Sequence, residues 1–191
     1  MNYLAHLHLG GQLPAQLLGS LYGDFVKGRL QGQFSPQIES AIQLHRSIDR
    51  FTDSHPLQAR ARARFPAARR RTAGMLLDLF FDHCLARDWA QYADQPLEHF
   101  TSQVYRVLAA EPQLPGRLAQ IAPYMAADDW LGSYREFAVM EQVLRGIQLT
   151  INGGDEPLEI STGGFLAYAS PNPVAGITSV DIAHTGAGRV R

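Results

Sequence analysis

Hydrophobic side chains recur at intervals of three and four residues along most of the chain, from its start to about residue 148. Leu17, Leu21 and Phe25 follow this spacing, and the segment 97–110 repeats it. The same period places side chains on one face of an α-helix. No strand-like alternation of useful length occurs in this region. We therefore predict an all-α fold for it, in the form of a helical bundle.

Prolines divide this helical region. Ser35 and Pro36 are typical of a helix start, because a serine side chain caps the first N–H groups and proline fits the first turn. Pro56 begins the next segment and Pro66 interrupts it. The helix that follows includes Leu77–Trp89 (LDLFFDHCLARDW), which is largely apolar yet contains two carboxylates and an imidazole within its apolar run.

The character of the sequence changes near residue 149. The segment 149–191 is rich in Gly, Thr, Ser and Pro, and it has neither Lys nor Arg between Arg145 and Arg189. Short β-branched stretches flank the turn-rich NGGDEP, which predicts a hairpin. We therefore predict a helical domain over 1–148 and an atypical tail over 149–191 that either packs as a hairpin or is disordered.

The overall composition is that of an ordinary soluble globular protein. The 191 residues are 46% apolar and 18% charged, with a formal net charge of -1. The single cysteine, Cys84, excludes an internal disulfide and a Cys-rich zinc site. No apolar run reaches the roughly 20 residues that span a bilayer, and the start lacks the basic segment of a signal peptide. We expect a cytoplasmic protein without a membrane span.

Positive charge is concentrated in one segment. Six arginines and no acidic residue occur there: Arg60, Arg62, Arg64, Arg69, Arg70 and Arg71. Such a cluster forms either a solvated helix face or a docking surface for an anionic partner. The segment has one aromatic residue, Phe65, so it offers little for stacking on bases, and we expect no nucleic acid partner.

Residue types that bind metal ions recur on successive predicted helices. His45 and Asp49 are four residues apart, which places them on one helix face, and Asp78 and Asp82 repeat the spacing with His83 adjacent. A buried carboxylate is costly without a partner, so helices that present these groups inward are suited to form a metal site. Each residue also has an ordinary explanation, either an ion pair with a nearby arginine or a hydrogen-bonded core imidazole.

The donor types indicate a hard divalent cation. Nitrogen and oxygen donors without thiolate fit Mn²⁺, Mg²⁺, Fe²⁺ or Zn²⁺, and the carboxylates favour the harder ions. Lys27 follows Asp24 by three residues and Arg46 is beside His45, so cations suited to a phosphate-bearing substrate lie near the candidate acids. No P-loop, dinucleotide-binding glycine motif or nucleophile elbow occurs.

Four ordered segments, MNYLAHLHL, GSLYGDFVKG, LHRSIDRFTDSHP and LDLFFDHCLARDW, resemble the acyl carrier protein phosphodiesterase family over residues 1 to about 147. The resemblance implies an HD-like helical bundle, distantly related to HD-type metal-dependent phosphohydrolases. It implies hydrolysis of the phosphodiester of holo acyl carrier protein, which releases 4′-phosphopantetheine and the apo carrier, with a divalent cation that is typically Mn²⁺. The acidic carrier would be the partner attracted by the arginine segment.

The resemblance also implies a site. It assigns the metal and catalytic centre to Asp24, His45, Asp49, Asp82 and His83, with His6 and Asp78 as further members. The HD order is His before Asp, whereas the pair here reads Asp82-His83, so the ligand set stays open. We expect Asp24 to orient or deprotonate a water molecule and Lys27 or Arg46 to neutralise phosphate charge.

Two other functions fit the same residues. One is an HD-like metal-dependent phosphohydrolase that acts on a nucleotide, and the other is a non-catalytic helical module that binds the carrier and whose acids are only salt-bridged. Metal content separates the module from both enzymes. Loss of the phosphopantetheine arm from the carrier separates the two enzymes.

The tail departs from the family, whose members continue with more helix and many charged residues. We interpret 149–191 as a replaced or out-of-frame terminus. Loss of terminal helices would expose apolar surface on the bundle. Either the tail or a second copy of the chain, in a homo-oligomer, would then cover that surface.

Overall fold

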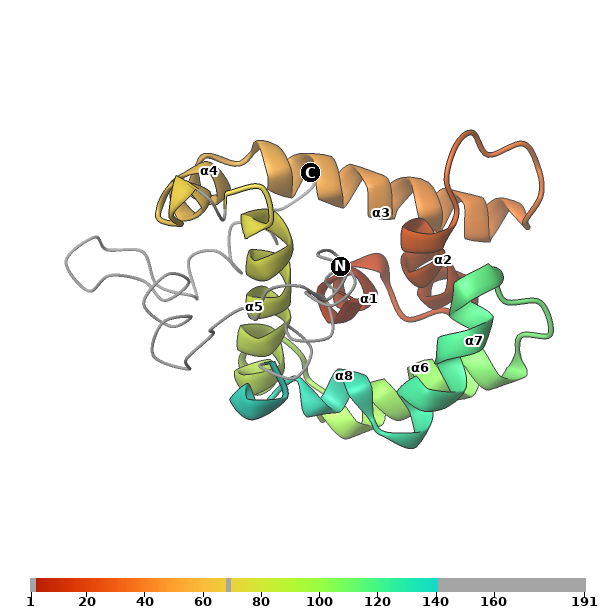
Figure 1. Cartoon of the computed structure of the whole chain (residues 1–191). Helices are drawn as coiled ribbons and strands as arrows, with labels where there is room; N and C mark the ends of the chain where they lie inside the picture. The colour runs from red at the N-terminus through yellow and green to blue at the C-terminus, as the bar shows by residue number, and fades with distance from the viewer. Residues whose placement is uncertain (1–2, 68–69, 141–191) are drawn as a thin grey trace.

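The structure, a computed structural model, describes residues 3–67 and 70–140. Regular secondary structure within these ranges is helical and includes no strand, which confirms the all-α prediction (Figure 1). The helices are α1 (Tyr3–Gly10), α2 (Pro14–Phe25), α3 (Pro36–Ser54), α4 (Pro56–Ala63), α5 (Ala73–Arg87), the 3-10 helix η2 (Trp89–Gln91), α6 (Leu97–Ala110), α7 (Gly116–Ala127) and α8 (Trp130–Ser133). The hairpin predicted in 149–191 lies outside the described residues.

Caps and prolines set the junction of α3 and α4. Ser35 accepts a hydrogen bond from the N–H of Ile38 at 3.3 Å, with Pro36 in the first turn of α3, as predicted. His55 ends α3, and its Nδ1 accepts from the N–H of Leu57 at 3.3 Å at the start of α4. These contacts satisfy N–H groups that have no acceptor within their own helix.

The short helix α1 lies in the middle of the molecule, where it contacts α2, α3 and α5 (Figure 1). Its side chains Leu4 and Leu7 are fully buried. α3 runs along one side, and α6, α7 and α8 gather on the other. α2 connects the two sides, because it contacts α3 as well as α6 and α7. Any group on the inner faces of α1 is therefore enclosed by neighbouring helices.

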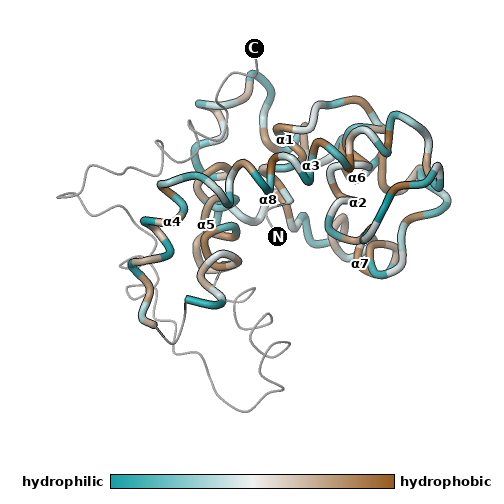
Figure 2. Tube along the Cα trace, turned by 90° about the horizontal axis from the view of Figure 1, so that it is seen from above, coloured by the Kyte–Doolittle hydropathy of each residue, from teal (hydrophilic) through white to brown (hydrophobic). Residues whose placement is uncertain are grey.

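The helices α3 and α5 bury different kinds of surface. α3 has one buried edge, formed by Ala41, Ile42 and His45. α5 is apolar over most of its length, and its buried residues include Asp82 and His83. Figure 2 shows teal and brown positions alternating along α3, whereas brown dominates α5. Polar groups buried in α5 need hydrogen-bond partners within the fold. None of the helices in the described ranges is both long and apolar enough to cross a bilayer.

Two glycines allow α2 and α3 to pack closely. A Cβ atom at Gly19 would lie 2.3 Å from the Cβ of Ala41 and 2.8 Å from the carbonyl oxygen of Ile38. One turn further along α2, a Cβ at Gly23 would collide with the ring of His45. Ala41 and His45 are also one turn apart, so the two glycines of α2 and these two residues of α3 form matching rows along which the helices meet.

Gly19→Ala should lower the free energy of unfolding by about 1–3 kcal/mol, because the added methyl group must push the helices apart. Urea denaturation measures this change. Ser40→Ala, on the exposed face of α3, is the control and should stay within about 0.5 kcal/mol of the wild type. An equally small effect at Gly19 would contradict the close packing.

Candidate metal centre

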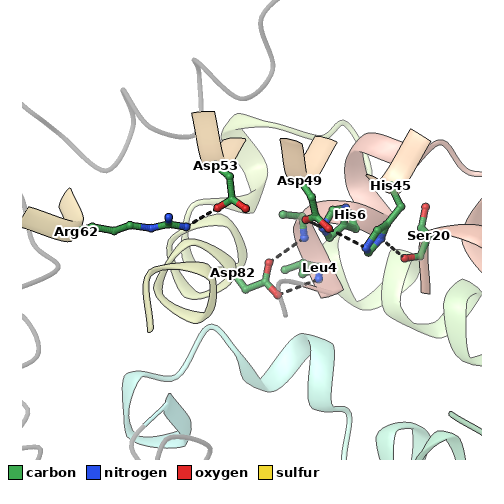
Figure 3. Close-up of polar contacts among 9 residues, drawn as sticks. Leu4, His6, Ser20, His45, Asp49, Asp53, Arg62 and Asp82 are labelled. Carbon is green, nitrogen blue, oxygen red and sulfur yellow. Dashed lines mark hydrogen bonds and ion pairs between the residues drawn. The ribbon is translucent and has the colours of Figure 1, made fainter. Parts of the chain in front are cut away.

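Three side chains from two helices meet where α1 contacts α3. His6 of α1 and His45 and Asp49 of α3 each offer one ligand atom, and these atoms lie within 4.8 Å of one another (Figure 3). Within the described ranges this is the group of His, Cys, Asp and Glu side chains whose spacing suits a metal ion. The structure thus brings together two residues predicted from their spacing and one predicted as a further member.

The backbone of α2 orients His45. Its Nδ1 donates to the carbonyl oxygen of Ser20 at 2.8 Å, so Nδ1 carries the hydrogen. In the neutral ring, Nε2 then presents a lone pair to Oδ2 of Asp49 at 3.4 Å. Two acceptors that face each other need a proton or a metal cation between them. Histidines that bind metals commonly have the other ring nitrogen held in this way.

Gly23 provides the space that His45 occupies. A Cβ at this position would lie 2.2 Å from Cγ, 2.3 Å from Cδ2 and 2.7 Å from Nδ1 of the imidazole. Neither Gly23 nor Ser20 was a predicted site residue. Glycine inside a helical pattern is the signal that could have marked the first. The second acts through its backbone carbonyl, which any residue type would supply.

His6 completes the group from α1. Its Nε2 lies 3.0 Å from Oδ1 of Asp49, and its ring stacks on that of His45 with centroids 3.7 Å apart. Both imidazoles are buried, whereas the Asp49 side chain is 51% exposed. Nδ1 of His6 is buried without a hydrogen-bond partner in the described part of the chain. The group is therefore enclosed around its imidazoles and open to solvent at its carboxylate.

Local electrostatics keep Asp49 ionised. Partial burial acts to raise its pKa, but hydrogen bonds from His45 and His6 outweigh this effect when protons occupy the facing imidazole nitrogens, and they then hold the pKa of Asp49 well below its usual value. A carboxylate that stays charged beside two imidazole nitrogens is a favourable environment for a cation.

Asp24 lies outside the three-residue group, in the last turn of α2 and one turn beyond Ser20. Its Oδ2 is buried, and no group of the described residues forms a hydrogen bond with it. The charge of Asp24 reaches Tyr3 at the start of α1. The pKa of Tyr3 is raised mainly by burial, and the negative charge of Asp24 raises it further. A buried carboxylate oxygen without a partner is unusual and calls for a functional explanation.

Asp82 and His83 of α5 have partners other than the three-residue group. The two oxygens of Asp82 accept from the N–H groups of Leu4 and Ala5 at 3.0 and 2.9 Å (Figure 3). Burial raises the pKa of Asp82 to about 7, although these hydrogen bonds act to lower it. Nδ1 of His83 donates to the carbonyl oxygen of Tyr134 at 2.8 Å, and burial lowers the pKa of this imidazole.

Asp78 is half-buried one turn before Asp82 in α5. Burial raises its pKa, and the negative charges of Asp53 and Asp49 act in the same direction. Asp78 therefore lies within electrostatic range of Asp49 without belonging to the three-residue group.

Arg46 and Lys27 are connected through the loop after α2. The guanidinium of Arg46 donates to the carbonyl oxygens of Val26 and Gly28, both at 2.9 Å. These two carbonyls flank Lys27, which is exposed. Arg46 thus holds the loop that carries Lys27, and the loop follows directly after Asp24 and Phe25 at the end of α2.

The arginine segment covers α4 and the connection to α5. Among its arginines that the structure describes, Arg60, Arg70 and Arg71 are exposed. Arg64 is half-buried, and Arg62 forms an ion pair with Asp53 of α3 (Figure 3). Arg69 lies outside the described residues. The exposed arginines agree with either a solvated face or a docking surface.

Comparisons with known proteins identify relatives of the chain. The family model "Acyl carrier protein phosphodiesterase" matches residues 1–165. Similar proteins of that name occur in Yersinia pestis, 39% identical over 152 residues, and in Escherichia coli, 38% identical over 149 residues. Each of these matches covers 77% of this chain and 77% of the relative. No solved structure gives a significant match.

Gly23→Ala should displace the imidazole of His45, because the new methyl group would overlap three of its ring atoms. We expect about 1–3 kcal/mol of lost stability and a shift of the His45 imidazole signals in ¹⁵N–¹H spectra. The signals of His99, which is exposed on α6, are the internal control. Unchanged His45 signals would contradict the contact between Gly23 and the ring.

Proposed function

The chain belongs to the acyl carrier protein phosphodiesterase family, and we propose that it hydrolyses the phosphodiester of holo acyl carrier protein to give 4′-phosphopantetheine and the apo carrier. The observation that carries this proposal is the convergence of His6, His45 and Asp49 at a point that is buried on one side and open on the other. Such a site accepts a substrate from solvent while helices hold its ligands.

The donors in this group fit a divalent cation, with Mn²⁺ as our first choice and Mg²⁺ or another divalent ion as alternatives. Nε2 of His45 and Oδ2 of Asp49 face each other as acceptors at 3.4 Å. His6 adds a second nitrogen beside the same carboxylate. When bound, a divalent cation supplies Lewis-acid stabilisation of the charge on a phosphodiester.

Asp24 is our candidate for the residue that orients and deprotonates the attacking water. Its buried Oδ2 has no partner among the described residues, so it is available to accept a proton. In the reaction, the water oxygen bonds to phosphorus and the bond from phosphorus to the serine oxygen of the carrier breaks. The serine oxygen takes up a proton as it leaves.

Lys27 is our candidate for neutralising phosphate charge, because it is exposed and follows the last turn of α2. Arg46 supports it, since its hydrogen bonds fix the carbonyls on either side of Lys27. In this proposal the ammonium contacts the substrate and the guanidinium positions the loop.

The exposed arginines support a docking role for the carrier. Arg70 and Arg71 follow α4 in the chain. α4 in turn follows α3, the helix that carries Asp49. α3 also exposes two large apolar side chains, Leu44 at 43% and Phe51 at 49%. A surface that combines cations with apolar groups suits an acidic protein whose contact face is amphipathic.

The decisive experiment follows the mass of purified holo carrier incubated with the protein. We expect a decrease equal to the mass of the phosphopantetheine arm, loss of this activity with EDTA, and recovery with Mn²⁺. Asp49→Asn should reduce kcat/KM at least about 100-fold, since it removes a charged ligand. Asp94→Asn, at an exposed acid outside the site, is the matched control.

Other outcomes separate the alternative functions. Metal-dependent hydrolysis of a nucleotide, with holo carrier left intact, would replace the proposed substrate. Binding of the carrier without metal content or turnover would instead identify a non-catalytic module.

Replacing Arg70 and Arg71 together with Glu should raise KM for the carrier about tenfold while kcat changes less than twofold, because exposed charges act mainly on encounter and orientation. The effect should shrink as salt is added. Arg106→Glu, exposed on α6, makes one comparable charge reversal away from the segment. An unchanged KM would remove the docking role.

A further inference from the structure

The helix that carries His6 is too short to be stable alone. α1 has 8 residues and no acidic residue in its first turn. Isolated helices shorter than about 12–15 residues are marginal in water. The position of His6 therefore depends on contacts that α1 makes with other helices.

Asp82 supplies a contact of this kind. Leu4 and Ala5 lie in the first turn of α1, where N–H groups have no acceptor within the helix. The Asp82 oxygens accept from these two groups at 3.0 and 2.9 Å, from α5 and across 78 and 77 positions of sequence (Figure 3). When Asp82 is ionised, its negative charge also lies at the positive end of the helix dipole. One side chain of a distant helix thus caps two N–H groups in the first turn of α1.

The carboxylate is itself firmly held. Asp82 is 1% exposed, and Leu79, Leu85 and Cys84 around it in α5 are buried as well. A side chain that packing holds in place also fixes the position of the groups that hydrogen-bond to it. Moving the start of α1 would require breaking both hydrogen bonds or moving α5.

We infer that Asp82 is a positioning residue that holds the first turn of α1 and thereby places His6 against Asp49 and His45. Its effect on catalysis rests on the proposed function, whereas its effect on α1 does not. This role differs from that of a metal ligand, because both oxygens face backbone N–H groups of α1 rather than the three-residue group.

Amide hydrogen exchange of the wild-type protein provides the first test. We expect the amides of Leu4 and Ala5 to exchange at least about tenfold more slowly than that of Gln37, which is exposed in the first turn of α3. Rapid exchange at Leu4 and Ala5 would overturn the inference without any variant.

Asp82→Asn provides the second test, because the amide group keeps one acceptor and turns a donor toward α1. We expect faster exchange at Leu4 and Ala5, and a Kd for Mn²⁺, measured by calorimetry, that rises about 10–100-fold at unchanged stoichiometry. Asp88→Asn is the matched control, since Asp88 pairs with Arg87 at the end of α5 and should leave both measurements unchanged.

The outcomes are separable. Loss of the metal site at saturating Mn²⁺, with Leu4 and Ala5 still protected, would make Asp82 a ligand and overturn the positioning role. An unchanged Kd and unchanged exchange would overturn it as well. If the variant does not fold, amide exchange at Leu4 and Ala5 of the wild-type protein decides whether the positioning role stands. The expected exchange and Kd without activity on holo carrier would refute the proposed function and leave the positioning role standing.

Discussion

The close approach of α2 and α3 is the contact on which the site depends. Gly19 of α2 lies against Ala41 of α3, and Gly23, one turn later, lies against His45. The missing side chains bring the imidazole of His45 within reach of the Ser20 carbonyl. That single hydrogen bond satisfies a buried polar atom and also selects which ring nitrogen faces Asp49. Packing and chemistry are thus determined by the same contact.

The parts of this arrangement that are local in sequence could be predicted. Helical periodicity and the Ser35-Pro36 start indicated an all-α fold, which the described residues have. His45 and Asp49 could be paired because four residues is a fixed spacing within one helix. His6 was expected only as a further member. Its partner lies 43 positions away, and no local spacing encodes how α1 packs on α3. The proposed HD-like relationship remains a prediction.

The hydrogen-bond partners of the buried polar residues of α5 could not be predicted from the sequence. Their types indicated that Asp82 and His83 need partners, but adjacent residues on a helix point about 100° apart. One therefore meets α1 and the other meets the carbonyl of Tyr134. Arg46 behaves in the same way, since it binds two carbonyl oxygens. Partners of this kind are backbone atoms common to all residues, so composition and spacing do not identify them.

The distance in sequence between Asp82 and α1 has a consequence for the order of events during synthesis. Chains emerge from the ribosome with the N-terminus first, so His6, His45 and Asp49 all appear well before Asp82. The matching rows of α2 and α3 can pair as soon as both helices exist. In contrast, the hydrogen bonds from Leu4 and Ala5 to Asp82 can form only after α5 has been made. A nascent chain that stops before α5 would therefore contain every residue of the three-residue group but not the contact that fixes its geometry.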